Sequence, residues 1–293
     1  MRSLGDTPRR RALLRVALYG GALFVGIPMA FAQVMTATRR EGAPASPPEG
    51  YEELALASEE GLRLRAWLAR GDPERAAAVV VHGLGDSLES YVGHARVLRE
   101  RGHSVLLVDL RGHGGSEGSY TALGAREHAD VAAAMAELRR RELAGRGILL
   151  EGHSMGAAAV LLAASREPGV RAVIAEAPYD SYRGTVEHHA RLLYGIPRWV
   201  PLIPTAIAMA EWRAGFDADD ADVVAAVRRI TAPLLAIADG EDQRMPEPVV
   251  RRVYDAHPGP KQLWVAPGVD HVGAIQLAEY GPRVRGFLEE NGL

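Results

Sequence analysis

Apolar residues gather in eight short runs, each followed by turn residues or by a stretch with helical spacing. The first two runs alternate apolar and polar positions and are adjacent, which is typical of an antiparallel hairpin. The later runs are almost continuously apolar, as parallel strands are when helices cover both faces of their sheet. Helical stretches such as 125–141 and 155–167 separate these runs, so the pattern predicts an α/β fold with one eight-stranded, mostly parallel sheet. The predicted strands are 51–57, 62–69, 76–82, 104–109, 147–152, 171–177, 233–239 and 261–266.

The segment between the sixth and seventh predicted strands is much longer than the roughly twelve residues that a crossover needs. We therefore expect a helical cap inserted there, at about 181–229. Its apolar side chains, among them Trp199, Ile203 and Trp212, either line a hydrophobic pocket or attach the cap to the sheet. His188 and His189 are adjacent and cannot face the same side of a helix, so they do not indicate a metal site.

The N-terminal segment 16–38 contains no charged residue. As a helix it would be about 34 Å long, which is enough to cross a bilayer. Arginines favour its N-terminal side, which predicts that the N-terminus lies in the cytoplasm and the rest of the chain outside. The flanking arginines are Arg2, Arg9, Arg10, Arg11 and Arg15 on one side and Arg39 and Arg40 on the other. We therefore predict a membrane anchor in 1–39, a proline-rich linker in 40–50 and an α/β domain in 51–293.

A cleaved export signal is the alternative interpretation of the same segment. Pro28 followed by Ala30, Phe31 and Ala32 is typical of the end of a signal peptide and its cleavage site. The stretch that begins at Arg10 also resembles a twin-arginine export signal. Both interpretations export the domain, and cleavage would give a secreted or periplasmic protein.

Composition narrows the classes of function further. The chain has 293 residues, is 47% hydrophobic and carries a formal net charge of -3, so it can bury the core of one large domain but has no positive field to attract nucleic acid. It has no cysteine, which excludes disulfides, thiolate nucleophiles and sulfur-ligated metals. We expect no cofactor and no metal, and the residues carry no prediction of the oligomeric state.

Polar side chains fall at the ends of the predicted strands. In a parallel sheet, the reactive groups gather beyond the carboxyl ends of the strands. His82, Asp109, Ser154, Asp242 and His271 all lie at or just after such an end. Two other histidines, His103 and His257, precede strands, so we expect them to be structural.

The sequence Gly152-His153-Ser154-Met155-Gly156 follows a predicted strand and opens an alanine-rich helix. A serine on such a strand-to-helix turn is exposed above the sheet, and side chains two residues to either side would collide with neighbouring backbone. This context predicts that Ser154 is a nucleophile.

A serine nucleophile needs a base and a carboxylate that orients the base. His271 follows the last predicted strand, so we expect it to be the base. Asp242 lies in the loop beyond the seventh strand, far enough past the sheet to reach the histidine, and is our candidate acid. The alternatives that remain open are Asp239, Glu241, Glu176 and Asp180.

Two backbone N–H groups must stabilise the oxyanion that forms during acyl transfer. Met155 directly follows the nucleophile and is expected to supply one. His82-Gly83-Leu84-Gly85 follows the third strand, and its glycines allow close approach, so Leu84 is expected to supply the other. His82 itself is expected to fix this turn rather than to carry a proton.

Together these motifs resemble the α/β-hydrolase superfamily, and in particular its branch of lysophospholipases, monoacylglycerol lipases and serine aminopeptidase-like proteins. The resemblance covers about residues 51–293. It implies that the Asp109-to-Gly114 loop is structural, so Arg111 and His113 are not among the expected catalytic residues. Asp239 stands where such sequences often have glycine, which keeps it open as an alternative acid. A serine at position 154 also differs from the aspartate of dehalogenases and epoxide hydrolases. The motifs are 82–85, 109–114 with Ser116, 152–156, Asp242 with Pro246, and His271.

These residues and the resemblance predict a serine hydrolase that cleaves carboxylic esters, with thioesters and lipid esters included, through an acyl-Ser154 intermediate. The expected partners are a small-molecule or lipid ester substrate and, through the N-terminal segment, a membrane. Two alternatives are an exported serine aminopeptidase or amidase and a catalytically silent binding module with the same fold.

Overall fold

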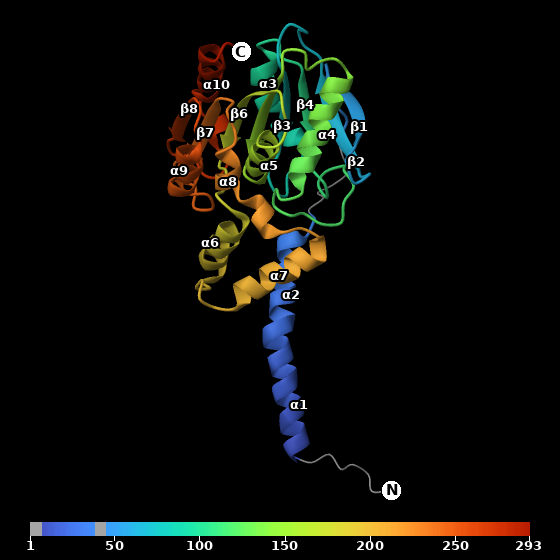
Figure 1. Ribbon diagram of the computed structural model, residues 1–293, viewed down its shortest axis with the longest axis vertical. Coiled ribbons are helices and arrows are strands. Elements are labelled where there is room, and N and C mark those ends of the chain that lie inside the picture. Colours follow the sequence, from blue (N-terminus) through green and yellow to red (C-terminus); the bar gives the residue numbers. More distant parts are fainter. Residues whose placement is uncertain (1–7, 39–44) are drawn as a thin grey trace.

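The computed structural model describes residues 8–38 and 45–293. Its centre is an eight-stranded sheet with the strand order β1-β2-β4-β3-β5-β6-β7-β8 (Figure 1). β2 pairs antiparallel with β1 and β4, and all other neighbours are parallel. The prediction of an eight-stranded, mostly parallel sheet is therefore confirmed. The strands are β1 (Glu52–Ala57), β2 (Arg63–Ala69), β3 (Ala77–Val81), β4 (Val105–Val108), β5 (Ile148–His153), β6 (Val170–Glu176), β7 (Leu234–Asp239) and β8 (Lys261–Ala266).

Helices cover both faces of the sheet, which explains why the central strands are mostly apolar. In β3, Val79 and Val81 face one layer of the core, and Ala78 and Val80 face the other. The first layer contains α4 (Glu127–Arg140), α5 (Met155–Ala164), α8 (Val223–Val227) and α9 (Glu247–Ala256). The second contains α3 (Val92–Arg99) and α10 (Tyr280–Glu290). Short 3₁₀ turns lie at η2 (Leu88–Tyr91), η3 (Ala218–Ala221) and η4 (Ala274–Gln276).

Three helices lie in the segment between β6 and β7. α6 (Tyr182–Tyr194) and α7 (Leu202–Ala214) stand below the rest of the domain in Figure 1, on the side from which the N-terminal helix leaves. α8, in contrast, contacts α5 and α9 and so belongs to the layer that covers the sheet. Trp199, just before α7, is 79% exposed, and Trp212, in α7, is 78% exposed. This part of the surface therefore presents large apolar side chains to its surroundings.

The N-terminal helix is continuous from Pro8 to Thr36 and projects away from the domain (Figure 1). It consists of α1 (Pro8–Gly21), a π-helical turn η1 (Ala22–Gly26) and α2 (Ile27–Thr36). This π-helical turn ends two residues before Pro28, which has no N–H and whose ring would crowd the carbonyl one turn back. The helix therefore passes through the proline instead of ending there.

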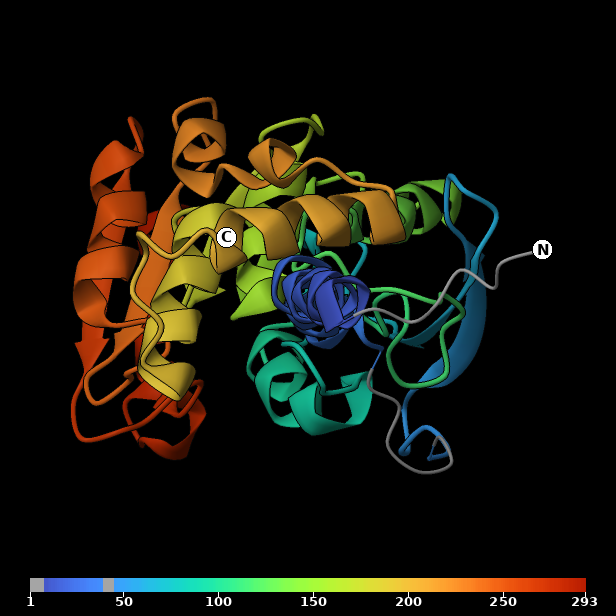
Figure 2. The ribbon, with the colours of Figure 1, turned by 90° about the horizontal axis from the view of Figure 1, so that it is seen from below.

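The C-terminal part of this helix is packed into the domain. α2 contacts α7, and Figure 2 shows the two helices side by side when the molecule is seen along the N-terminal helix. Pro28, Ala32 and Thr36 are buried, whereas no residue of α1 is buried.

Part of the predicted flanks and linker lies outside the described residues: Arg2, Arg39, Arg40 and positions 41–44. The remaining part of the linker contacts the domain. The N–H of Ala45 donates to Oε1 of Glu89 (3.2 Å), and the N–H of Tyr51 donates to the carbonyl of Pro48 (3.1 Å).

Candidate active site

Ser154 occupies the sharp turn between β5 and α5, with φ 54° and ψ -117°. A non-glycine residue rarely adopts a positive φ, and such strain persists where the surrounding structure enforces it. The neighbouring glycines show what enforces it here. A Cβ at Gly152 would collide with the carbonyl of Gly156, and a Cβ at Gly156 would collide with the carbonyl of His82. The motif therefore contains glycine because backbone segments touch at both positions.

His271 lies in the loop after β8 and bridges the serine and a carboxylate. Its Nε2 is 2.9 Å from Oγ of Ser154, and its Nδ1 is 2.6 Å from Oδ2 of Asp242. With the proton on Nδ1, the ring donates to the carboxylate and accepts the serine hydroxyl proton at Nε2. This is the arrangement that a serine nucleophile and its base require.

The carboxylate of Asp242 is held in a fixed position. Its side chain is fully buried, and Oδ1 accepts hydrogen bonds from the backbone N–H groups of Arg244 (2.7 Å) and Met245 (3.0 Å). Burial alone would raise the pKa of Asp242, but the hydrogen bond and charge of His271 and the two amides hold it below its usual value. Asp242 therefore stays ionised beside the histidine.

The alternative acids have other partners. Oδ2 of Asp239 accepts the N–H of Val272 (2.9 Å), and its burial and the charge of Glu176 raise the pKa of Asp239 to about 8. Asp180 pairs with Arg252, and Glu241 is exposed. Glu176 pairs with a different histidine, described below. Of the five candidate carboxylates, the structure brings Asp242 to His271.

The turn after β3 lies against Ser154. A Cβ at Gly83 would lie 3.5 Å from Cβ of Ser154, and Leu84 lines the cavity that contains Ser154. Met155 is the first residue of α5, where helix N–H groups have no partner within the helix. Among the described residues, neither the N–H of Leu84 nor that of Met155 donates a hydrogen bond, so both can donate to an oxyanion.

His82 holds this turn in place through both ring nitrogens. Its Nδ1 lies 2.7 Å from the carbonyl oxygen of Gly83, and its Nε2 accepts the N–H of Leu110 (3.0 Å). Burial lowers the pKa of His82. The ring is therefore neutral and fully used by backbone groups, as expected of a turn-fixing residue.

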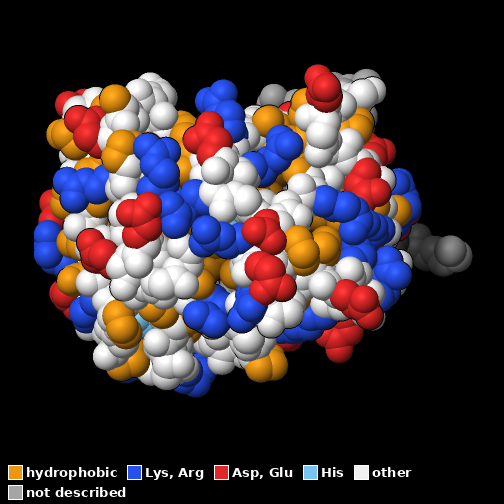
Figure 3. Space-filling model, turned by 90° about the horizontal axis from the view of Figure 1, so that it is seen from above, with side chains coloured by type: hydrophobic (Ala, Val, Ile, Leu, Met, Phe, Trp, Pro, Cys, Tyr) orange, Lys and Arg blue, Asp and Glu red, His pale blue; other side chains and the backbone are white. Residues whose placement is uncertain are grey.

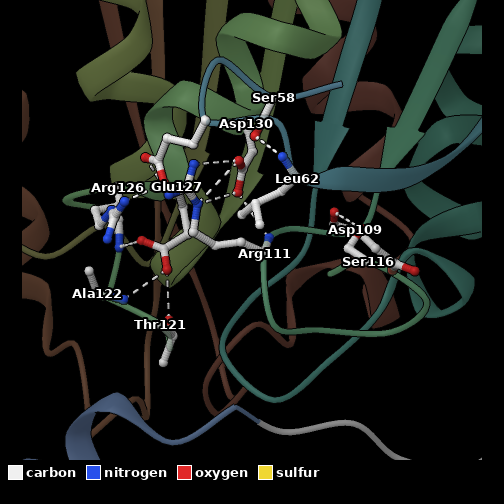
Figure 4. Close-up of polar contacts among 12 residues, drawn as sticks. Ser58, Leu62, Asp109, Arg111, Ser116, Thr121, Ala122, Arg126, Glu127 and Asp130 are labelled. Atoms are coloured by element: carbon white, nitrogen blue, oxygen red, sulfur yellow. Dashed lines mark hydrogen bonds and ion pairs between the residues drawn. The ribbon is translucent and has the colours of Figure 1, made fainter. Parts of the chain in front are cut away.

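The Asp109-to-Gly114 loop is also held by internal contacts (Figure 4). Arg111 pairs with the buried Asp130 (2.7 Å) and with Glu60 (2.8 Å), while Oδ1 of Asp109 accepts the N–H of Leu88 (2.8 Å). Nδ1 of His113 contacts the carbonyl of Arg111 at 2.9 Å. These contacts fix the loop, and none of them involves Ser154 or His271.

A buried polar cluster behind Ser154 was not predicted from the sequence. Nδ1 of His153 lies 2.9 Å from Oε2 of Glu176, and its Nε2 lies 3.3 Å from Oε1 of Glu151. Burial lowers the pKa of His153, but the two glutamates more than offset it and raise it to about 9. The sequence could have indicated this pair, because His153 and Glu176 end two consecutive predicted strands. These strands are neighbours in the sheet and place the two residues opposite each other.

His94 completes this cluster from α3. Its ring lies 4.2 Å from that of His153, and neither of its nitrogens has a hydrogen-bond partner among the described residues. Ligand atoms of His94, His153 and Glu176 lie within 4.8 Å of one another, close enough to surround one metal ion. A metal would first have to displace the proton that the glutamates hold on His153.

Two cavities meet at Ser154. The smaller, about 180 Å³, is lined almost entirely by apolar side chains, including Leu84 and Met155. The larger, about 590 Å³, also contains Leu84 and Ser154 and is bordered by polar groups such as Arg244 and His271. Ser154 thus lies where an apolar compartment meets one with both polar and apolar walls.

Comparison with known proteins agrees with this architecture. Residues 72–204 match the sequence family described as serine aminopeptidase, S33. The chain resembles the esterase Pf2001 of Pyrococcus furiosus with a TM-score of 0.70 and 23% identity over 87% of this chain and 99% of that one. The structural likeness shows the α/β-hydrolase fold, as predicted. The family match, which covers less than half of the chain, supports a hydrolase.

Two relatives found by sequence are uncharacterized proteins. The chain is 29% identical over 196 residues to the uncharacterized protein YqkD of Bacillus subtilis, which is 66% of this chain and 64% of that protein. It thus spans slightly less than two thirds of that relative. It is also 23% identical over 83% of its length to 81% of the uncharacterized membrane protein YNL320W of Saccharomyces cerevisiae.

Proposed function

We propose that this protein is a serine hydrolase that cleaves carboxylic esters, a class that includes thioesters and lipid esters. The observation that carries the proposal is the hydrogen-bonded series Ser154, His271 and Asp242 at the junction of the two cavities. In the first step, Oγ of Ser154 attacks the ester carbonyl while His271 takes its proton. Asp242 stabilises the imidazolium that results.

The remaining steps follow from the same groups. The N–H groups of Leu84 and Met155 donate to the oxyanion of the tetrahedral intermediate. His271 then gives its proton to the leaving alcohol, and the acyl group stays on Ser154. Water, deprotonated by His271, attacks the acyl-Ser154 ester, and His271 returns this proton to Oγ of Ser154 as the acid is released.

Ser154→Ala tests the assignment. We expect kcat for p-nitrophenyl esters to fall by at least about 10³ with the fold intact, because the three residues act as a unit. Ser90→Ala is the matched control, since Ser90 borders the larger cavity but contacts Asp86 instead of His271. A fluorophosphonate should label the wild type and the control but not Ser154→Ala. Absence of label on the wild type would favour the catalytically silent binding module.

An aminopeptidase or amidase is the second candidate, favoured by the description of the matching family. Such an enzyme needs an acidic group for the amine of its substrate. Asp86 is the acidic residue among those that line the larger cavity. If amides are the substrates, aminoacyl p-nitroanilides should be cleaved faster than esters, and Asp86→Asn should reduce that activity alone.

We also propose that the N-terminal segment is a single membrane span with the domain outside the cytoplasm, followed by a linker in 40–50 and the α/β domain in 51–293. The helix Pro8–Thr36 has a mean hydropathy of 1.6 in its most apolar window, and 6% of that window is buried. Arg9, Arg10 and Arg11 begin it, which favours a cytoplasmic N-terminus.

The surface of the domain supports a membrane on the side from which the N-terminal helix leaves. The exposed Trp199 and Trp212 lie on the side of the emerging helix, and tryptophan is enriched at membrane interfaces. The opposite face carries interspersed charges of both signs (Figure 3), as expected of a surface in water. A secreted or periplasmic form after cleavage at Ala32 is the alternative.

A further inference from the structure

The end of the N-terminal helix lines the apolar cavity at Ser154. Phe31, Val34 and Met35 of α2 border this cavity together with Leu84 and Met155. None of the residues that line it is charged. One wall of the compartment beside the nucleophile therefore comes from the segment that precedes the catalytic domain.

Specific contacts hold α2 in this place. The ring of Phe31 meets that of Tyr194 in α6 edge to face, with centroids 5.1 Å apart. The carbonyl of Thr36 accepts the N–H of Thr121 (3.2 Å), and Nε of Arg213 donates to Oγ1 of Thr36 (3.2 Å). Tyr194 and Arg213 belong to the segment between β6 and β7, and Thr121 belongs to the main part of the domain. Because α2 contacts both parts, it is fixed relative to Ser154.

We propose that α2 is a substrate-binding element whose residues Phe31 and Met35 determine the length of the acyl chain accepted at Ser154. This inference rests on the proposed ester hydrolysis. An acyl chain attached to Ser154 must leave the serine through one of its two compartments. The compartment that α2 completes is the apolar one, and burial of each methylene there favours binding of longer, unbranched chains.

The position of Phe31 distinguishes this role from simple anchoring. Phe24 lies on the same helix, is 64% exposed and does not border the cavity. If the helix only anchored the domain, both phenylalanines would contribute equally, because both are apolar. If the helix also forms a wall of the cavity, Phe31 affects the substrate and Phe24 does not.

The test compares Phe31→Ala with Phe24→Ala in the full-length protein, using p-nitrophenyl acetate, butyrate, octanoate and laurate. We expect Phe31→Ala to lower kcat/KM for octanoate and laurate by at least about tenfold relative to acetate, the size of effect that a few methylene contacts produce. Phe24→Ala should keep the wild-type profile. Met35→Trp, which fills the cavity, should shift the preference toward acetate and butyrate, and Phe31→Leu should restore most of the longer-chain activity.

Labelling by a fluorophosphonate separates the two levels of the proposal. Labelled Ser154 with an unchanged chain-length profile in both Phe31→Ala and Met35→Trp would overturn the role of α2 and leave the hydrolase intact. A wild type that neither labels nor cleaves any ester would overturn both.

Discussion

Oδ2 of Asp242 lies 2.6 Å from Nδ1 of His271, whereas Asp239, at the end of β7, directs a carboxylate oxygen to the backbone of Val272. Asp242→Asn should therefore lower kcat by about 10⁴, because the amide cannot hold the required tautomer or stabilise the imidazolium. Asp239→Asn should cost less than about tenfold, since a pKa of about 8 keeps Asp239 neutral at pH 7, as asparagine is. Turnover of one ester by both variants measures the ranking, and the reverse order would make Asp239 the acid.

The close contact between α5 and the turn after β3 predicts a second result. Gly156→Ala introduces a Cβ that collides with the carbonyls of His82 and Val81. Backbone atoms cannot yield as a flexible side chain does, so we expect the free energy of unfolding to fall by about 1–3 kcal/mol or more, with loss of activity. Gly145→Ala is the control, because a Cβ there meets nothing within 4 Å. Thermal unfolding of both variants measures the difference, and equal midpoints would contradict the close approach.

The buried cluster behind Ser154 predicts a loss of stability at alkaline pH. The pKa of His153 is raised from 6.5 to about 9, so its ion pairs with Glu151 and Glu176 contribute fully below about pH 6.5 and are lost as pH rises through 9. Asp239 acts in the same direction. Its pKa in the folded protein is raised to about 8, so the stability that its protonated form contributes is lost as pH rises through 8. The other ionisable groups that face His153 are His94, Tyr91 and Tyr280, which burial keeps neutral.

Denaturant unfolding from about pH 7 to about pH 10 tests this sign. The wild type should lose stability steadily across the range. Glu176→Gln removes one partner of His153 and the charge that adds to burial in raising the pKa of Asp239, so its stability should be lower at pH 7 but should change less with pH. A steeper dependence in Glu176→Gln than in the wild type would show that the cluster is not the source.

Much of the fold was predictable because burial on both faces leaves a plain signal. The central strands are mostly apolar, and the observed strands begin and end within one residue of the predicted ones. The proposed site residues were found for a related reason. Ser154, Asp242 and His271 all follow strands of one parallel sheet, so topology alone brings them to the same edge.

The role of α2 could not be predicted in this way. Phe31, Val34 and Met35 are apolar, and an apolar residue in a membrane-length helix has the same sequence pattern whether it faces lipid or a cavity. The passage of the helix through Pro28 also depends on the π-helical turn that precedes it, and no sequence pattern indicated this turn. The position of the helix end is a tertiary property, set by contacts with residues as distant as Arg213.

The last prediction concerns the membrane and the linker. The sequence predicts that a protease added outside the inner membrane cuts between residues 40 and 50, because a proline-rich linker is a preferred site. Sequence alone also predicts release of a soluble, active domain, since all proposed site residues lie beyond Tyr51. The contacts of α2 change this second expectation: Ala32 and Thr36 are buried against the domain, so the cut domain should stay bound to the N-terminal helix.

Fractionation after protease treatment measures the outcome. Ester activity and fluorophosphonate label should remain in the membrane pellet, and the two fragments should separate only after denaturation. Sealed inverted vesicles are the control, because their lumen protects the linker if the domain lies outside the cytoplasm. Labelled domain in the soluble fraction would mean that the α2 contacts are too weak to hold it. A soluble mature protein that begins at Gln33 would instead mean that the segment is a cleaved signal. Such a protein would have lost both the anchor and Phe31, so the proposed role of Phe31 would fail with it.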